Sequence, residues 1–120
     1  MKNLADMLVG LVAVAHLWFL VLEMFLWTKP YGRRVFKLTV EKAELTKGLA
    51  MNQGLYNGFL AAGLAWGLYA GAEGYPVKVF FLGCIIIAGI FGGATVGRKI
   101  LWVQAVPAAV ALAAVCASRG

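Results

Sequence analysis

Four stretches of this sequence are long and apolar enough to cross a lipid bilayer as helices. A membrane-spanning helix needs about 20 mostly apolar residues, and the windows 4–27, 49–70, 77–96 and 100–117 each meet that requirement. Together these windows occupy more than two thirds of the 120 residues. The sequence therefore predicts a single all-α membrane domain over residues 1–120, a bundle of four transmembrane helices, with no room for a soluble catalytic domain.

The composition excludes two other classes of protein. Hydrophobic residues make up 62% of the chain and charged residues 13%, whereas a soluble domain has about 45–50% apolar and about 25% charged residues. The formal net charge of +6 would suit nucleic acid, but a nucleic-acid binder presents a basic stripe on a soluble surface. We therefore expect the lipid bilayer as the partner, and no nucleic acid.

The positions of the basic residues predict the orientation. Eight lysines and arginines lie in the connections 28–48 and 97–99, against three on the opposite side. The eight are Lys29, Arg33, Arg34, Lys37, Lys42, Lys47, Arg98 and Lys99, and the three are Lys2, Lys78 and Arg119. Because basic loops stay in the cytoplasm, we expect both termini on the non-cytoplasmic side of a bacterial inner membrane that the chain crosses several times. Binding of anionic lipid head groups by the basic loop is an alternative use of the same charges.

The connections between the windows predict neighbouring, antiparallel helices. The turns at 71–76 and 97–99 are short, and short turns place consecutive helices side by side in opposite directions. Pro30 and Gly32 close the first span, since proline removes a backbone donor and glycine accepts turn geometry. Residues 38–47 tolerate a helix, so the second span is also compatible with an earlier start and a solvated extension into the cytoplasm.

Small residues recur at one-turn spacing in three of the four windows. Glycines stand at 63, 67 and 71 and again at 89, 93 and 97, while alanines stand at 105, 109, 113 and 117. Such stripes let the backbones of membrane helices approach closely. We expect a compact bundle and, because symmetric assembly is common among proteins, a homo-oligomer.

Two ionisable residues lie inside the first span and share one of its faces. His16 and Glu23 are seven residues apart, which is two helical turns and about 10.5 Å along the axis, with Trp27 almost on the same line. They are too far apart to bond each other, so each needs a partner from another helix. Ionisable residues within a membrane are rare and costly, and they mark functional sites.

The second span begins with a dense polar cluster. Asn52, Gln53, Tyr56 and Asn57 cover about 140° of one helix face, and we expect Gly54 and Gly58 on the opposite, close-packing face. The fourth span adds one further amide. With the predicted orientation, Glu23, both asparagines and both glutamines lie in the inner half of the bilayer.

These residues form a candidate site with two kinds of member. Glu23 and His16 are the candidates for acid/base catalysis, because both can carry a proton. The candidates for ligand contact are Asn52, Gln53, Tyr56, Asn57, Gln104 and Trp27. With one histidine and no second strong ligand at metal spacing, no metal site is expected, and no cofactor is indicated.

Three functions are compatible with this pattern. The first is binding of, or acid/base chemistry on, a small lipid-soluble molecule, with the amides orienting its oxygen atom. The second is a small proton-coupled transporter or exporter that uses Glu23. The third is a structural or accessory membrane subunit, in which the polar residues only fix how the helices pack.

Several segments resemble a family of small bacterial membrane proteins known as domain of unknown function thirteen-oh-four. They are His16 with Glu23 and Trp27, the hexapeptide Asn-Gln-Gly-Leu-Tyr-Asn at 52–57 with the following Gly-Phe-Leu, and residues 88–92 and 103–108. This resemblance implies a small multi-pass membrane protein and brings no activity, substrate or cofactor.

A fainter similarity is to the MAPEG family of glutathione-dependent and eicosanoid enzymes. It rests on the length, the four helices, and Lys47 and Asn52 at the start of the second helix. Leu55 stands where that family carries a glutamate, so this similarity implies the architecture alone.

Overall fold

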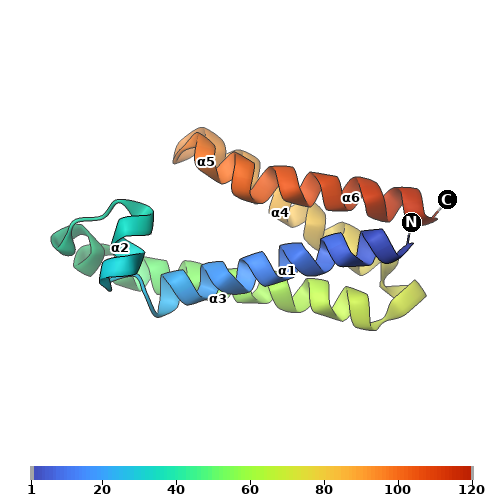
Figure 1. The fold of residues 1–120 in the computed structure, drawn as a ribbon, viewed down its shortest axis with the longest axis horizontal. Coiled ribbons are helices and arrows are strands. Elements are labelled where there is room, and N and C mark those ends of the chain that lie inside the picture. Colours follow the sequence, from blue (N-terminus) through green and yellow to red (C-terminus); the bar gives the residue numbers. More distant parts are fainter. Residues whose placement is uncertain (1, 120) are drawn as a thin grey trace. The chain divides into compact units, whose positions relative to one another are not determined.

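The computed structural model describes residues 2–119, and within them the chain is helical with no strand. Its elements in chain order are α1 (Lys2–Met24), α2 (Pro30–Phe36), α3 (Val40–Tyr69), the 3-10 turn η1 (Gly71–Gly74), α4 (Tyr75–Thr95), α5 (Arg98–Ile100), the π-helical segment η2 (Leu101–Ala105) and α6 (Val106–Arg119), as Figure 1 shows. The all-α prediction is confirmed.

Three helical stretches of the described chain are long and apolar enough to cross a membrane: Lys2–Met24, Gly71–Thr95 and Arg98–Arg119. The longest helix, α3, has 30 residues and is not among the three, because Asn52, Gln53 and Asn57 interrupt its apolar sequence. At about 1.5 Å per residue, α3 is nevertheless longer than the hydrocarbon core, which is about 30 Å thick.

The helix ends differ from the predicted spans at several places. The first helix stops at Met24 instead of residue 27, and a short helix, α2, occupies part of the predicted loop 28–48. Lys29 is extended, with φ −82° and ψ 158°, as expected for a residue before proline. Pro30 therefore begins a new helix, whereas we predicted only a turn. The early start of the second long helix is confirmed, since α3 begins at Val40.

The chain divides into two compact units, which we describe separately. Residues 14–61 form one unit, hereafter the α2 unit, and the segments Met1–Ala13 and Ala62–Gly120 form the other, hereafter the α4 unit. The α2 unit holds the end of α1, all of α2 and the first part of α3. The α4 unit holds the start of α1, the end of α3 and everything that follows.

In the α4 unit, Gly89 brings α4 into backbone contact with the π-helical segment. A Cβ atom on Gly89 would lie 2.5 Å from the backbone nitrogen of Ala105 and 2.7 Å from its Cβ. Both residues are buried, and α4 continues along α6. The close approach predicted for these two small-residue stripes is therefore present at this pair.

The π-helical turn stands directly before Pro107. The backbone N–H of Val106 donates to the carbonyl of Leu101, five residues back. Proline has no N–H, so the Val103 carbonyl lacks the donor that an α-helix would supply four residues later. A single π turn is a common way for a helix to accommodate such an interruption.

Gly63 and Gly67, near the end of α3, lie against α4. A Cβ on Gly63 would lie 2.5 Å from ring atoms of Phe81, and one on Gly67 would lie 2.6 Å from Cγ of Lys78. Gly71 has φ 63°, a left-handed conformation that glycine adopts without strain, and it follows the end of α3. Two glycines of the predicted stripe, Gly63 and Gly67, therefore allow close contact with α4, and the third, Gly71, supplies the turn conformation.

In the α2 unit, α1 and α3 run antiparallel (Figure 1). Small residues line the buried face of α3. The buried positions of α3 in this unit are Ala43, Ala50, Gly54, Asn57 and Ala61. Their spacing of three, four or seven residues follows one helix face. Small side chains let α1 approach closely, and Asn57 is the polar exception on this face.

Candidate functional site

The central contact of the site is a hydrogen bond between α1 and α3. The Asn57 side-chain amide Nδ2 donates to Oε1 of Glu23 at 2.5 Å. Asn57 is 4% exposed, and Glu23 is partly buried. Of the residues predicted to form the site, these two are brought into direct contact, which joins the ionisable first span to the polar cluster of the second.

Glu23 lies in the last turn of α1, because that helix ends one residue later at Met24. The last carbonyl groups of a helix have no hydrogen-bond partner within the helix and carry a partial negative charge. They therefore disfavour a negatively charged side chain nearby. Neither ion pair found among residues 2–119, Lys47 with Glu44 or Lys78 with Asp6, involves Glu23. Within those residues, its carboxyl group is held by the neutral amide of Asn57 alone.

The two glycines of the polar cluster lie on the same side of α3 as Asn57. A Cβ on Gly54 would lie 3.1 Å from Cβ of Glu23 and 2.6 Å from Cγ of Met24, and one on Gly58 would lie 2.7 Å from Cδ1 of Leu20. We predicted these glycines on a close-packing face, which the contacts confirm. We predicted Asn57 on the opposite, polar face, whereas it is buried beside them. Residues 57 and 58 come three and four residues after residue 54, about one helical turn, so all three positions face the same neighbouring helix.

The hydrogen bond to Glu23 comes from Asn57 and not from the other polar residues of the cluster. Asn52, Gln53 and Tyr56 are exposed in the α2 unit, and Tyr56 packs at 6.1 Å from the ring of Phe59. Asn52 is five residues before Asn57 and so lies about 7.5 Å nearer the start of α3, toward the connection that follows α1. The sequence placed all four polar residues on one functional face, but only Asn57 meets Glu23.

His16 lies within α1, away from the ends of the helix, and its side chain is buried. It is 1% exposed, and its ring packs edge-on against Phe19 at 5.0 Å between centroids. Seven residues separate it from Glu23, about 10.5 Å along the helix. The two side chains therefore occupy separate places, as expected from their spacing.

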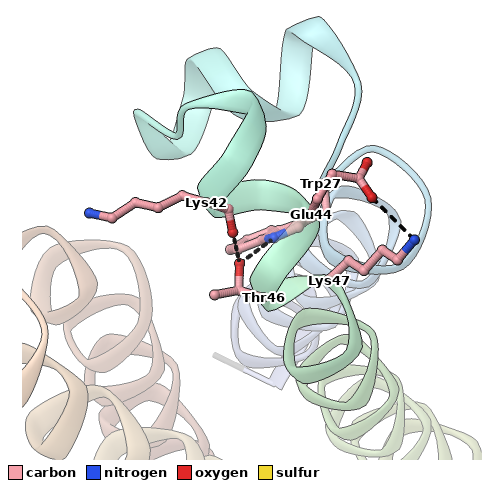
Figure 2. A network of polar contacts seen from close by, with 5 residues as sticks. All are labelled: Trp27, Lys42, Glu44, Thr46 and Lys47. Atoms are coloured by element: carbon pink, nitrogen blue, oxygen red, sulfur yellow. Dashed lines mark hydrogen bonds and ion pairs between the residues drawn. The ribbon is translucent and has the colours of Figure 1, made fainter.

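Trp27 belongs to a polar network that fastens the chain after α1 to the start of α3 (Figure 2). Its indole Nε1 donates to Oγ1 of Thr46 at 3.0 Å, and that hydroxyl donates to the Lys42 carbonyl at 2.7 Å. The Trp27 ring also packs 4.7 Å from Phe36 of α2. Trp27 is therefore held by contacts with both α2 and α3.

Gln104 lies in the π-helical segment of the α4 unit. It is partly buried. The sequence grouped this residue with Glu23 by depth, whereas the chain builds it into a different unit from Glu23 and Asn57.

An ion pair joins α1 to α4 within the α4 unit, and the sequence pattern did not predict it. Nζ of Lys78 and Oδ1 of Asp6 are 3.3 Å apart, and the Lys78 side chain is only 9% exposed. Asp6 and Lys78 stand near the N-terminal ends of α1 and α4. The predicted orientation has both helices begin on the same side of the membrane, which would put Asp6 and Lys78 at similar depth, and this was the signal available in the sequence.

No three side chains of histidine, cysteine, aspartate or glutamate gather within residues 2–119 as a metal ion would require. The contact observed at the site joins one carboxyl group and one amide. An amide that fixes one oxygen leaves the second carboxyl oxygen to accept or donate a proton. Glu23 itself is only partly buried.

Comparison with known proteins places the chain in a family. Residues 10–116 match the family described as "Protein of unknown function (DUF1304)". The chain is also 30% identical over 96 residues to the "Uncharacterized protein YpaA" of Lactococcus lactis subsp. lactis (strain IL1403), covering 78% of this chain and 81% of that protein. No solved structure matches it. The match spans most of the sequence, and the chain therefore belongs to the DUF1304 family.

Proposed function

We propose that this membrane protein binds a small lipid-soluble molecule at Glu23 and Asn57 and transfers a proton to or from an oxygen of that molecule. The observation that carries this proposal is the 2.5 Å hydrogen bond between the Asn57 amide and the Glu23 carboxyl group. A carboxyl at the end of a membrane-spanning helix is costly and poorly suited to packing alone. Asparagine or glutamine would hold two helices together without a transferable proton.

The geometry supports different roles for Asn57 and Glu23. Asn57 holds Oε1 of Glu23 and so fixes the plane of the carboxyl group. Oε2 then serves as the proton donor or acceptor for a hydroxyl, carbonyl or epoxide oxygen of the ligand. Gly54 supports this arrangement, because a larger residue there would displace the Cβ of Glu23.

The remaining predicted residues take supporting roles in this proposal. Gln53 lies one turn before Asn57 on α3 and is exposed, so it is suited to contact a ligand that approaches Glu23 from the lipid. Asn52 and Tyr56 border the same surface. His16, buried two turns away from Glu23, is the second group able to carry a proton.

We also propose that α3 is a fourth membrane span. Its residues 54–58 pack on residues 20–24 of α1, and α3 then runs back antiparallel to a helix that is long and apolar enough to cross the membrane. A neighbour in that position crosses the same bilayer. Both termini then face outward, and the basic connection between α1 and α3 faces the cytoplasm.

Native mass spectrometry of the protein extracted in mild detergent tests the binding site. We expect wild type to retain a small molecule that Glu23→Gln loses, because glutamine keeps the shape and the bond to Asn57 but has no proton to transfer. The matched control is Glu73→Gln, a change at an exposed glutamate of the turn η1, and it should retain the molecule. Equal retention in Glu23→Gln, or no retained molecule in wild type, would overturn the proposal.

Proton-coupled transport is the second candidate, and the Asp6–Lys78 pair favours it. This pair places ionisable groups near the start of α1, whereas Glu23 stands at its end. A transporter needs polar groups toward both membrane faces. Proton flux into vesicles that Glu23→Gln abolishes, without any retained molecule, would favour this function over the first.

A further inference from the structure

Four basic side chains lie on the short helix α2 or directly beside it, and we call them the α2 basic surface: Lys29 before the helix, Arg33 and Arg34 within it, and Lys37 after it. Three of them are exposed and Arg33 is partly buried. No aspartate or glutamate occurs between Met24 and Val40. Neither ion pair found among the described residues involves any of the four. Their positive charges are therefore not balanced within the part of the chain that the structure describes.

Aromatic contacts hold this surface against the end of a membrane-spanning helix. The Tyr31 ring lies 6.3 Å from that of Trp18 on α1, and Phe36 packs on Trp27. Trp18 and Tyr31 are each 45% exposed. Exposed tryptophan and tyrosine rings are enriched at the level of the lipid head groups, which is where these contacts place α2.

The backbone fixes α2 in this position. A Cβ on Gly32 would collide with the carbonyl oxygen of Leu26, so α2 lies directly on the chain that leaves α1. The guanidinium Nε of Arg33 donates to the Thr28 carbonyl at 3.2 Å. Arg34 lies over the Tyr31 ring at 5.6 Å. The charges are thus carried on a positioned helix and not on a free loop.

We infer that the α2 basic surface binds the phosphate head group of an anionic phospholipid. A short helix with basic side chains and exposed aromatic rings, held beside a transmembrane helix, matches the charge and the depth of such head groups. This goes beyond the orientation signal of a basic loop, because it assigns the binding to particular side chains. It does not depend on the proposed chemistry at Glu23.

The test is a lipid titration of the purified full-length protein, followed by native mass spectrometry. Phosphatidylglycerol and phosphatidylcholine with identical acyl chains are added to wild type and to the variant Arg34→Gln/Lys37→Asn. Asparagine suits position 37, where φ is 56°. We expect wild type to prefer phosphatidylglycerol by about tenfold or more, and the variant to lose about tenfold in affinity for that lipid alone.

Two further variants keep the inference falsifiable. Arg98→Gln/Lys99→Gln removes the same charge from the connection after α4 and should bind phosphatidylglycerol as wild type does. Arg34→Lys/Lys37→Arg keeps both charges and should also bind as wild type does. Equal losses in both charge-removing variants, loss in the charge-keeping variant, or no preference in wild type would each overturn the inference.

Discussion

Asp6 and Lys78 form an ion pair in which one partner is buried and the other is not. Their Oδ1 and Nζ atoms are 3.3 Å apart, and the side chains are 37% and 9% exposed, respectively. The stem of Lys78 packs on Gly67, where a Cβ would lie 2.6 Å from its Cγ. The ammonium group of a lysine in this position depends on Asp6 for its charge partner.

We therefore expect Asp6→Asn to destabilise the protein more than the double change Asp6→Asn/Lys78→Met. Removing one partner leaves a buried charge without compensation, whereas removing both leaves an apolar contact of similar size. The single change should lower the free energy of unfolding by about 1–3 kcal/mol, less than for a fully buried pair because Asp6 is partly exposed. Thermal unfolding in detergent measures this, and equal melting temperatures for wild type and the single variant would contradict it.

The contact between Gly89 and Ala105 leads to a second prediction. A Cβ at position 89 would meet the Ala105 backbone at 2.5 Å, so Gly89→Ala should push α4 away from the π-helical segment. We expect a loss of about 1–3 kcal/mol, typical of overpacking. Thermal unfolding in detergent again provides the measurement.

Gly83 supplies the matched control on the same helix, because nothing lies within 4 Å of a Cβ placed there. Gly83→Ala should leave stability unchanged or raise it by up to about 1 kcal/mol, since alanine favours a helix. If both variants behaved alike, the close approach at Gly89 would not stabilise the fold.

Hydropathy predicted the long helices well, because membrane spans must be long and apolar regardless of their neighbours. The window 77–96 corresponds to α4 at Tyr75–Thr95, and 100–117 lies within the helical stretch Arg98–Arg119. Hydropathy could not predict α2, since Pro30 and Gly32 are compatible with a turn as well as with a short helix. The π turn was also missed, although Pro107 was a visible signal.

The site was predicted in part, for a reason that concerns α3. The sequence identified Glu23 and the polar cluster, and the structure joins Glu23 to Asn57. A helical wheel gives angles but does not say which face meets a neighbour. The buried stripe of small residues runs through Ala50, Gly54 and Ala61 and includes Asn57. That spacing, and not the polarity, would have separated Asn57 from Asn52 and Gln53.

The bond between Asn57 and Glu23 gives a third prediction. Asn57→Ala removes a buried amide and leaves the carboxyl group without its donor, so the free energy of unfolding should fall by about 1 kcal/mol or more. Asn52→Ala is the control for stability, because Asn52 is exposed, and its effect should stay within about 0.5 kcal/mol. Similar losses in the two variants would mean that the bond to Glu23 contributes nothing to stability.

The number of membrane crossings gives a fourth prediction, made with single cysteines at two exposed glutamates. Glu44 lies near the start of α3 and Glu73 lies in η1 after its end. Cys84 and Cys116, the two free cysteines of the described chain, are first replaced by alanine.

If α3 crosses the bilayer, Glu44→Cys and Glu73→Cys lie on opposite sides. In intact cells a membrane-impermeant maleimide should then label position 73 and reach position 44 only after the cells are broken open, because basic connections stay in the cytoplasm. Labelling of both positions from the same side would show that α3 does not cross, and only the three helical stretches Lys2–Met24, Gly71–Thr95 and Arg98–Arg119 would then remain as candidate spans of the described chain.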